Sequence, residues 1–183
     1  MNRQLALELL HEYVQSESLR KHAYAVEAAM RAYCHLFGED EELWAETGLL
    51  HDFDYERWPD PPDHTQKGAE ILRARGVDEE VVEAILSHAE WNDIPRDTPL
   101  KRTLFAVDEL CGFITAVAYV RPSRCLAEVD VKSIRKKMKD KAFARAVRRE
   151  DITEGAALLG VELDEHIGIC LAALQGISAE LGL

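Results

Sequence analysis

The sequence has no long apolar run. Hydrophobic residues make up 47% of the 183 residues, but no stretch approaches the roughly 18 apolar residues that a membrane-spanning helix needs. The opening residues, Met1-Asn2-Arg3-Gln4, are polar and lack the apolar core of a signal peptide. We therefore expect a cytoplasmic protein with no membrane partner. The chain is long enough to bury the core of one domain.

Closely spaced cysteine pairs are also missing. The four cysteines, at positions 34, 111, 125 and 170, form no CxxC motif and no short disulfide framework. This pattern is typical of reduced and mostly packed thiols, which agrees with a cytoplasmic location.

Positive charge is scarce. The chain has 22 Lys and Arg residues against 34 Asp and Glu residues, which gives a net charge of −12. Because a phosphate backbone attracts a basic surface, this balance argues against general nucleic-acid binding.

The scarce basic residues are concentrated between residues 132 and 149. That segment holds nine of them and a single acid, Asp140, so it carries +8. Since the whole chain carries −12, the rest carries −20. Two interpretations are open. The segment is either a solvated helix face, which is usual for such a run, or a basic wall that receives an anionic substrate.

Signals for β-strands are missing as well. No stretch alternates cleanly and no Asn-Gly or Asp-Gly hairpin is present, whereas apolar residues recur at helical spacing nearly everywhere. We predict an all-α bundle, with Ser18, Asp40 and Asp78 as helix caps. The predicted helices span about residues 4–14, 19–37, 41–51, 64–75, 79–88, 100–119, 150–159 and 164–181, with one or two more in the basic segment.

Six possible metal ligands lie on these helices. They are His22, His51, Asp52, His64, His88 and Asp108. The pair His51-Asp52 ends the third predicted helix. Asp108 lies between apolar neighbours, where an unpartnered carboxylate would be costly. Each histidine alone has a structural explanation, as a packed, helix-end or surface residue. Together, imidazole and carboxylate suit manganese, iron or zinc, and a bundle can bring several helices to one cavity.

The order of these residues resembles the HD-domain superfamily of metal-dependent phosphohydrolases. The family pattern is a histidine, a His-Asp pair and a distant aspartate. Here these are His22, the pair within GLLHDFDYE, and Asp108 within LFAVDEL. His64 in DHTQKGAEIL and His88 in AILSHAEW match the subgroup that adds ligands for a second metal ion. The whole pattern looks like an uncharacterised group of predicted hydrolases of about this length.

The resemblance implies a helical bundle with a central metal site. One domain would span residues 1–183, with its core at about 18–122 and residues 123–183 packed on it. His22, His51, Asp52 and Asp108 would bind one metal ion. His64 and His88 would bind a second, and Asp52 would bridge both. Manganese or iron is favoured over calcium, which prefers oxygen ligands only, and magnesium, nickel or zinc also fits. A hydroxide held between two ions would be the nucleophile.

The residues after the pair depart from better-known branches of that superfamily. Many members continue as His-Asp-Ile-Gly-Lys, whereas Phe53-Asp54-Tyr55 follows here and the lysine is absent. The deoxynucleotide-monophosphatase branch uses a glutamate at the third position after the aspartate, and Tyr55 stands there. Mechanisms that depend on those side chains therefore do not transfer.

Further roles are assigned by position along the chain. Asp52 would be a catalytic residue as the bridge that the resemblance implies, and by position Asp54 and Glu56 are candidates to orient a water or accept a proton, unless they lie on a solvated loop. The candidate phosphate contacts are Lys21, Arg57, Arg121, Lys136 and Lys137. The aromatic residues Tyr24, Phe53, Tyr55, Trp58 and Trp91 form either a base-stacking wall or plain core and loop anchors.

Three functions fit this pattern. The leading one is hydrolysis of a small phosphoester or phosphoanhydride, with a nucleotide as the expected substrate. The second is oxygenation, because some HD-fold proteins with this six-ligand type of site resemble di-iron oxygenases. The third is a regulatory domain that binds a nucleotide without turnover.

Overall fold

The computed structural model describes residues 1–183 as helices joined by loops, with no β-strand. This confirms the predicted all-α fold. The helices are α1 (Arg3–Tyr13), α2 (Glu17–Phe37), α3 (Glu41–Leu50), α4 (Asp63–Ala74), α5 (Glu79–His88), α6 (Pro99–Tyr119), α7 (Val131–Met138), α8 (Arg149–Leu159), α9 (Leu163–Gly176) and α10 (Ser178–Leu181). Two short 3-10 helices, η1 (Glu90–Asn92) and η2 (Leu126–Glu128), lie in the loops.

Side-chain caps fix where several helices begin. Asp40 accepts from the Leu43 amide at 3.0 Å and Asp78 from the Glu80 amide at 2.9 Å, as predicted. The predicted cap of α2 was wrong. Ser16 accepts from the Leu19 amide at 3.5 Å, and Ser18 lies inside the first turn. The earlier start places Glu17 in the first turn, where a negative charge is favourable near the helix N-terminus.

The C-terminal third differs from the predicted helices mainly near its end. The basic segment forms one helix, α7, which agrees with the predicted one or two, and turns follow it. These turns are organised by the Arg149 guanidinium, which donates to the carbonyls of Phe143, Ala144 and Val147. The last predicted helix divides into α9 and α10 because Ile177 has a non-helical backbone.

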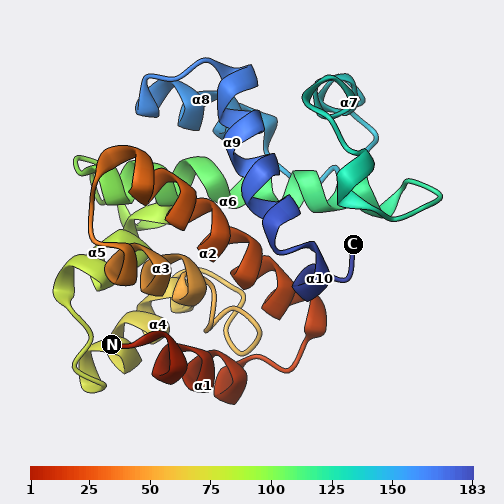
Figure 1. The fold of residues 1–183 in the computed structure, drawn as a ribbon. Coiled ribbons are helices and arrows are strands. Elements are labelled where there is room, and N and C mark those ends of the chain that lie inside the picture. The colour runs from red at the N-terminus through yellow and green to blue at the C-terminus, as the bar shows by residue number, and fades with distance from the viewer.

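Helix α6 lies at the centre of the molecule and packs against α2, α5, α8 and α9. Figure 1 shows α1, α3, α4 and α5 on one side of it and α7, α8 and α9 on the other. The apolar core forms two clusters. The larger holds 26 buried residues, mainly from α2, α6 and α9, and the smaller holds 15, mainly from α1, the end of α3, α4 and α5. None of the helices combines the length and apolar character that a bilayer span demands.

Gly48 allows α3 to lie directly against α2. A Cβ atom at this position would lie 2.9 Å from the Glu27 Cα and 2.9 Å from the Met30 Cγ. This contact brings His51, three residues later, beside His22, with 5.1 Å between the ring centroids. The close packing of α2 and α3 is therefore a precondition for the site described below.

We expect Gly48→Ala to lower the free energy of unfolding by about 1–3 kcal/mol, because the added methyl group meets backbone that has no room to move. Urea unfolding followed by circular dichroism measures the change. Gly168→Ala in α9 is the matched control, since its Cβ would meet only the Val131 Cγ2, at 3.9 Å. That variant should be unchanged, or more stable by up to ~1 kcal/mol from helix propensity. Equal stability of the two variants would contradict this account of the packing.

Candidate metal centre

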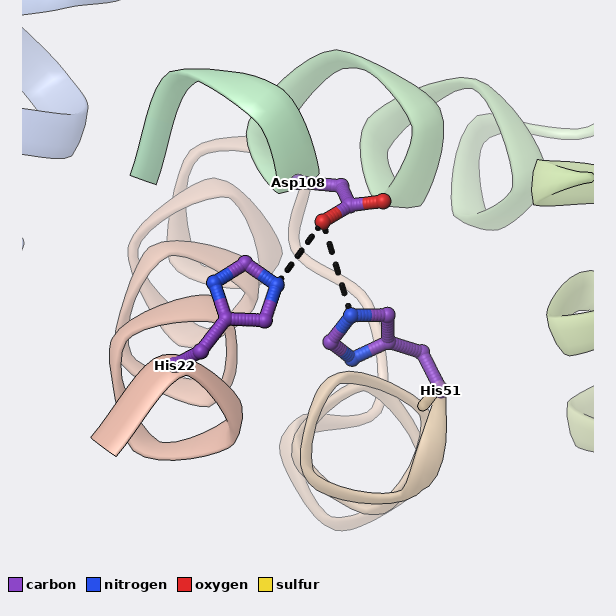
Figure 2. Close-up of side chains that lie close together, drawn as sticks. All are labelled: His22, His51 and Asp108. Atoms are coloured by element: carbon purple, nitrogen blue, oxygen red, sulfur yellow. Dashed lines mark hydrogen bonds and ion pairs between the residues drawn. The ribbon is translucent and has the colours of Figure 1, made fainter. Parts of the chain in front are cut away.

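Three of the predicted ligands converge from three different helices. His22 projects from α2, His51 ends α3, and Asp108 projects from the middle of α6 (Figure 2). The Asp108 Oδ1 lies 2.9 Å from the His22 Nε2 and 3.5 Å from the His51 Nε2. One metal ion could be held by this first group of ligands.

A second group lies beside the first. The Asp52 Oδ1 is 3.3 Å from the His64 Nε2 and 3.3 Å from the His88 Nε2. The other oxygen of the same carboxylate, Oδ2, is 3.5 Å from the His51 Nε2 in the first group. Each oxygen of Asp52 therefore faces a different group, which is the geometry of a bridging ligand.

The far nitrogens of the imidazoles are held by oxygen acceptors. The His51 Nδ1 donates to the Gly48 carbonyl at 2.8 Å, and the His88 Nδ1 donates to the Ile85 carbonyl at 2.6 Å. A carbonyl oxygen can only accept, so the proton is on Nδ1 in both rings. In the neutral ring the Nε2 lone pair then points at a carboxylate oxygen, and a cation between the two atoms removes that repulsion.

Asp54 holds the His64 imidazole through Nδ1 in the same way. Its Oδ1 accepts from the His64 Nδ1 at 2.8 Å, and its Oδ2 accepts from the Gly68 amide at 2.8 Å. A Cβ atom on Gly68 would lie 2.8 Å from that Oδ2, so only glycine leaves room for the carboxylate. Such a carboxylate–histidine pair orients the ring and makes Nε2 a better metal ligand.

The residues present fit a divalent metal ion. The His51 Nε2 and the Asp52 Oδ1 are buried and have no hydrogen-bond partner. His51 is fully buried, whereas the side chains of Asp52 and Asp108 are each 22% exposed. Orphaned polar atoms of this kind are rare in folded proteins. Four imidazoles and two carboxylates form the mixed nitrogen and oxygen donor set that first-row transition metals prefer.

The pKa values of several ligand side chains are shifted because imidazoles and carboxylates lie so close together. Burial opposes charge on His51, but Asp52 and Asp108 outweigh it and hold the pKa of His51 well above its usual value. Burial also opposes charge on His64, and Asp52 and Asp54 raise the pKa of this ring to about 9. Burial likewise opposes ionisation of Asp52 and Asp108, but the neighbouring imidazoles hold the pKa of each carboxyl far below its usual range.

Four histidines and two aspartates gathered inside a helical bundle are typical of the class of helical metal-binding proteins. The comparison with known families specifies the class further, because the HD domain matches residues 19–112. The chain therefore belongs to the HD domain family, which confirms the resemblance seen in the sequence. HD domains bind divalent metal ions and are generally metal-dependent hydrolases. No solved structure matches the chain significantly.

A cavity of about 220 Å³ opens beside both groups of ligands. Asp52, His64, His88 and Asp108 line it, as do the aromatic side chains of Tyr55, Phe105 and Trp91. Trp91 also donates from Nε1 to the His64 carbonyl at 2.9 Å. Of the other aromatic residues considered from the sequence, Phe53 is buried in the smaller apolar cluster.

Four charged residues of this cavity did not emerge from the sequence. They are Glu90, Glu109, Arg148 and Asp151. Arg148 pairs with Glu90 at 2.6 Å and with Asp151 at 3.4 Å. Burial and the neighbouring Asp108 raise the pKa of Glu109 to about 7. Glu109 could have been found in the sequence because it follows the predicted ligand Asp108. Arg148 could not, because it was one of nine basic residues with nothing to distinguish it.

The other predicted contacts lie away from this cavity. Glu56 accepts from the amides of Gln15 and Ser16 at 2.7 and 3.0 Å and so holds the loop between α1 and α2. The Arg57 guanidinium lies over the Tyr13 ring, 3.9 Å from its centroid. Lys21 pairs with Glu17 at 2.7 Å and lines a small pocket on the other side of His22.

The remaining three predicted phosphate contacts lie together elsewhere. Arg121, Lys136 and Lys137 line a separate pocket between the end of α6 and α7. Of the nine basic residues between 132 and 149, only Arg148 lines the cavity at the metal ligands. A substrate role for Lys21, Arg57, Arg121, Lys136 and Lys137 stays a prediction.

We expect Asp54→Asn to weaken binding of one of two metal ions by about 10–100-fold, because the His64 ring loses its anionic acceptor. Manganese titration monitored by electron paramagnetic resonance measures both affinities. The first group of ligands has no contact with Asp54 and should keep its ion. Glu56→Gln removes an equal charge outside the site and is the control. If both variants bind metal like the unaltered protein, Asp54 does not position His64.

Metal binding at pH 7 should release at least one proton per protein, because a metal ion takes only the unprotonated imidazole. His64 holds its Nε2 proton at this pH in the metal-free protein, since its pKa is raised to about 9, and the pKa of His51 is shifted in the same direction by Asp52 and Asp108. Metal affinity should therefore rise with pH up to about 9. Calorimetric titration in two buffers of different ionisation enthalpy counts the protons. A count of zero would exclude the raised pKa values.

Proposed function

We propose that the protein is a metal-dependent phosphohydrolase acting on a small phosphoester or phosphoanhydride, with a nucleotide as substrate. One observation carries the proposal. The bridging geometry of Asp52, with one oxygen toward each ligand group, lies beside an open cavity. Two-metal sites of this kind stabilise the attacking and leaving oxygens of a phosphoryl group. The comparisons support membership of a family of this general chemistry, and the substrate is part of our proposal.

Different residues of this chain bind the metal ions, orient their ligands and transfer protons in the proposed reaction. The proposed metal ligands are His22, His51, Asp52, His64, His88 and Asp108. Divalent ions bound there, manganese or iron in our proposal, supply Lewis acidity and make hydroxide available at neutral pH. Asp54 orients the His64 ring through the hydrogen bond from its Nδ1. Glu109 exchanges its carboxyl proton near neutral pH and is placed to protonate a leaving oxygen.

Arg148 is the proposed contact for the substrate phosphate. It is the one arginine or lysine that lines the cavity, and a guanidinium binds phosphate oxygens in pairs. Its partners Glu90 and Asp151 hold it at the rim until a substrate competes for it. The exposed face of Trp91 supports the choice of a nucleotide, because the base can stack on an aromatic ring.

Manganese-loaded protein should hydrolyse at least one member of a panel of nucleoside mono-, di- and triphosphates and simpler phosphoesters. We expect His51→Ala and Asp52→Ala to reduce kcat/KM by about 100-fold or more, since each removes a metal ligand. Phosphate release measures activity. His35→Ala is the matched control, because His35 is exposed and lies outside both groups of ligands. Circular dichroism shows whether each variant is folded.

Other outcomes of the same experiment separate the alternatives. Equal activity in His51→Ala, Asp52→Ala and the unaltered protein would falsify the proposal. Substrate loss that requires dissolved oxygen, after anaerobic loading with iron, would replace it with an oxygenase. A nucleotide that raises the melting temperature and is recovered intact would replace it with a binding domain.

A further inference from the structure

A second pocket lies at the far end of α6 from the metal ligands. It has a volume of about 410 Å³ and lies between the C-terminal end of α6 and α7. Three cationic side chains line it, Arg121, Lys136 and Lys137, together with Ser133, whose hydroxyl donates to the Asp130 carbonyl at 2.8 Å in the cap of α7. Its apolar wall consists of Val117, Val120 and Pro122.

The positive charge of this pocket is largely uncompensated. Asp140 is the only acidic residue that lines it, and it lies 3.9 Å from Lys137, so the lining carries a net charge of +2. Arg121 and Lys136 take part in none of the ion pairs of the structure, and the Arg121 Nε is buried without a hydrogen-bond partner. A buried guanidinium nitrogen with no acceptor needs an anion or water to complete it.

This pocket is distinct from the metal cavity, because the two share no lining residue. Asp108 and Arg121 are 13 residues apart along α6 and its end. At a rise of about 1.5 Å per residue this corresponds to roughly 20 Å. In Figure 1 the α7 end of the molecule lies well away from α5, whose last residue is His88. No single small substrate can fill both pockets.

We propose that this pocket is a second anion site that binds the phosphate group of a small phosphorylated ligand. Arg121, Lys136 and Lys137 hold the phosphate oxygens, and the apolar wall takes the uncharged part of the ligand. The volume falls within the roughly 300–1,000 Å³ of small-molecule sites. A concave pocket with an apolar wall fits such a ligand better than it fits a nucleic-acid backbone, which binds along extended basic surfaces.

Nuclear magnetic resonance of ¹⁵N-labelled protein equilibrated with magnesium tests the proposal, with inorganic phosphate as the probe. Saturable shifts of the Arg121 and Ser133 amides are expected. Lys136→Gln combined with Lys137→Gln should weaken this binding at least about tenfold, because two charge-assisted contacts are lost. Lys139→Gln combined with Lys141→Gln is the control. It removes the same charge from exposed positions of the same segment outside the pocket, and should change affinity by less than about twofold.

Two results would overturn the proposal. In the first, the shifts are confined to amides around the metal cavity, such as that of Glu109. In the second, both double variants weaken phosphate binding equally, which would mean that a diffuse basic face attracts the ion. Neither result bears on hydrolysis at the metal centre, because the spectra report each site separately and require no turnover.

Discussion

The arrangement of the metal ligands depends on one carboxylate. Asp52 directs one oxygen to the imidazole of His51 and the other to those of His64 and His88. The Nδ1 protons of these three rings are already donated to other oxygens, so lone pairs meet lone pairs at the centre. A folded chain tolerates this only when protons or metal ions occupy the space between them. The ends of α3 and α5, the start of α4 and the middle of α6 are placed to maintain that arrangement.

The ligand set could be predicted from the sequence because histidine and aspartate are metal ligands by residue type. The HD pattern supplies the order of these residues along the chain. The walls of the cavity could not be predicted. Arg148 and Asp151 reach it only because the chain returns to α6 through α8, and no local pattern encodes that return. Arg121 was a candidate phosphate contact because it follows the Asp108 helix, and Lys136 and Lys137 were candidates if the basic segment folded over the cavity. Their place was decided by where α7 packs, at the other end of α6.

Local rules predicted the helices well where the signal itself was local. Asp40 and Asp78 are caps because each is a short acceptor before an apolar repeat. Ser16 and Ser18 satisfy the same rule equally well, so the rule could not choose between them. The turns after α7 depend on one donor that follows them directly in the chain, the Arg149 guanidinium, which binds the carbonyls of Ala144 and Val147 at once. Helix propensity in residues 139–148 does not reveal these contacts, so the sequence left open whether the basic segment forms one helix or two.

The metal centre lies between the two apolar clusters and would link their stabilities. Asp108 comes from a helix that belongs to the larger cluster, whereas Asp52 follows a segment that belongs to the smaller one. An ion ligated by both sides binds tightly only while both clusters are folded, so its binding free energy adds to the coupling between them. Metal occupancy would thus govern whether the halves unfold together or separately. The same ligands would set the cooperativity of the fold as well as its chemistry.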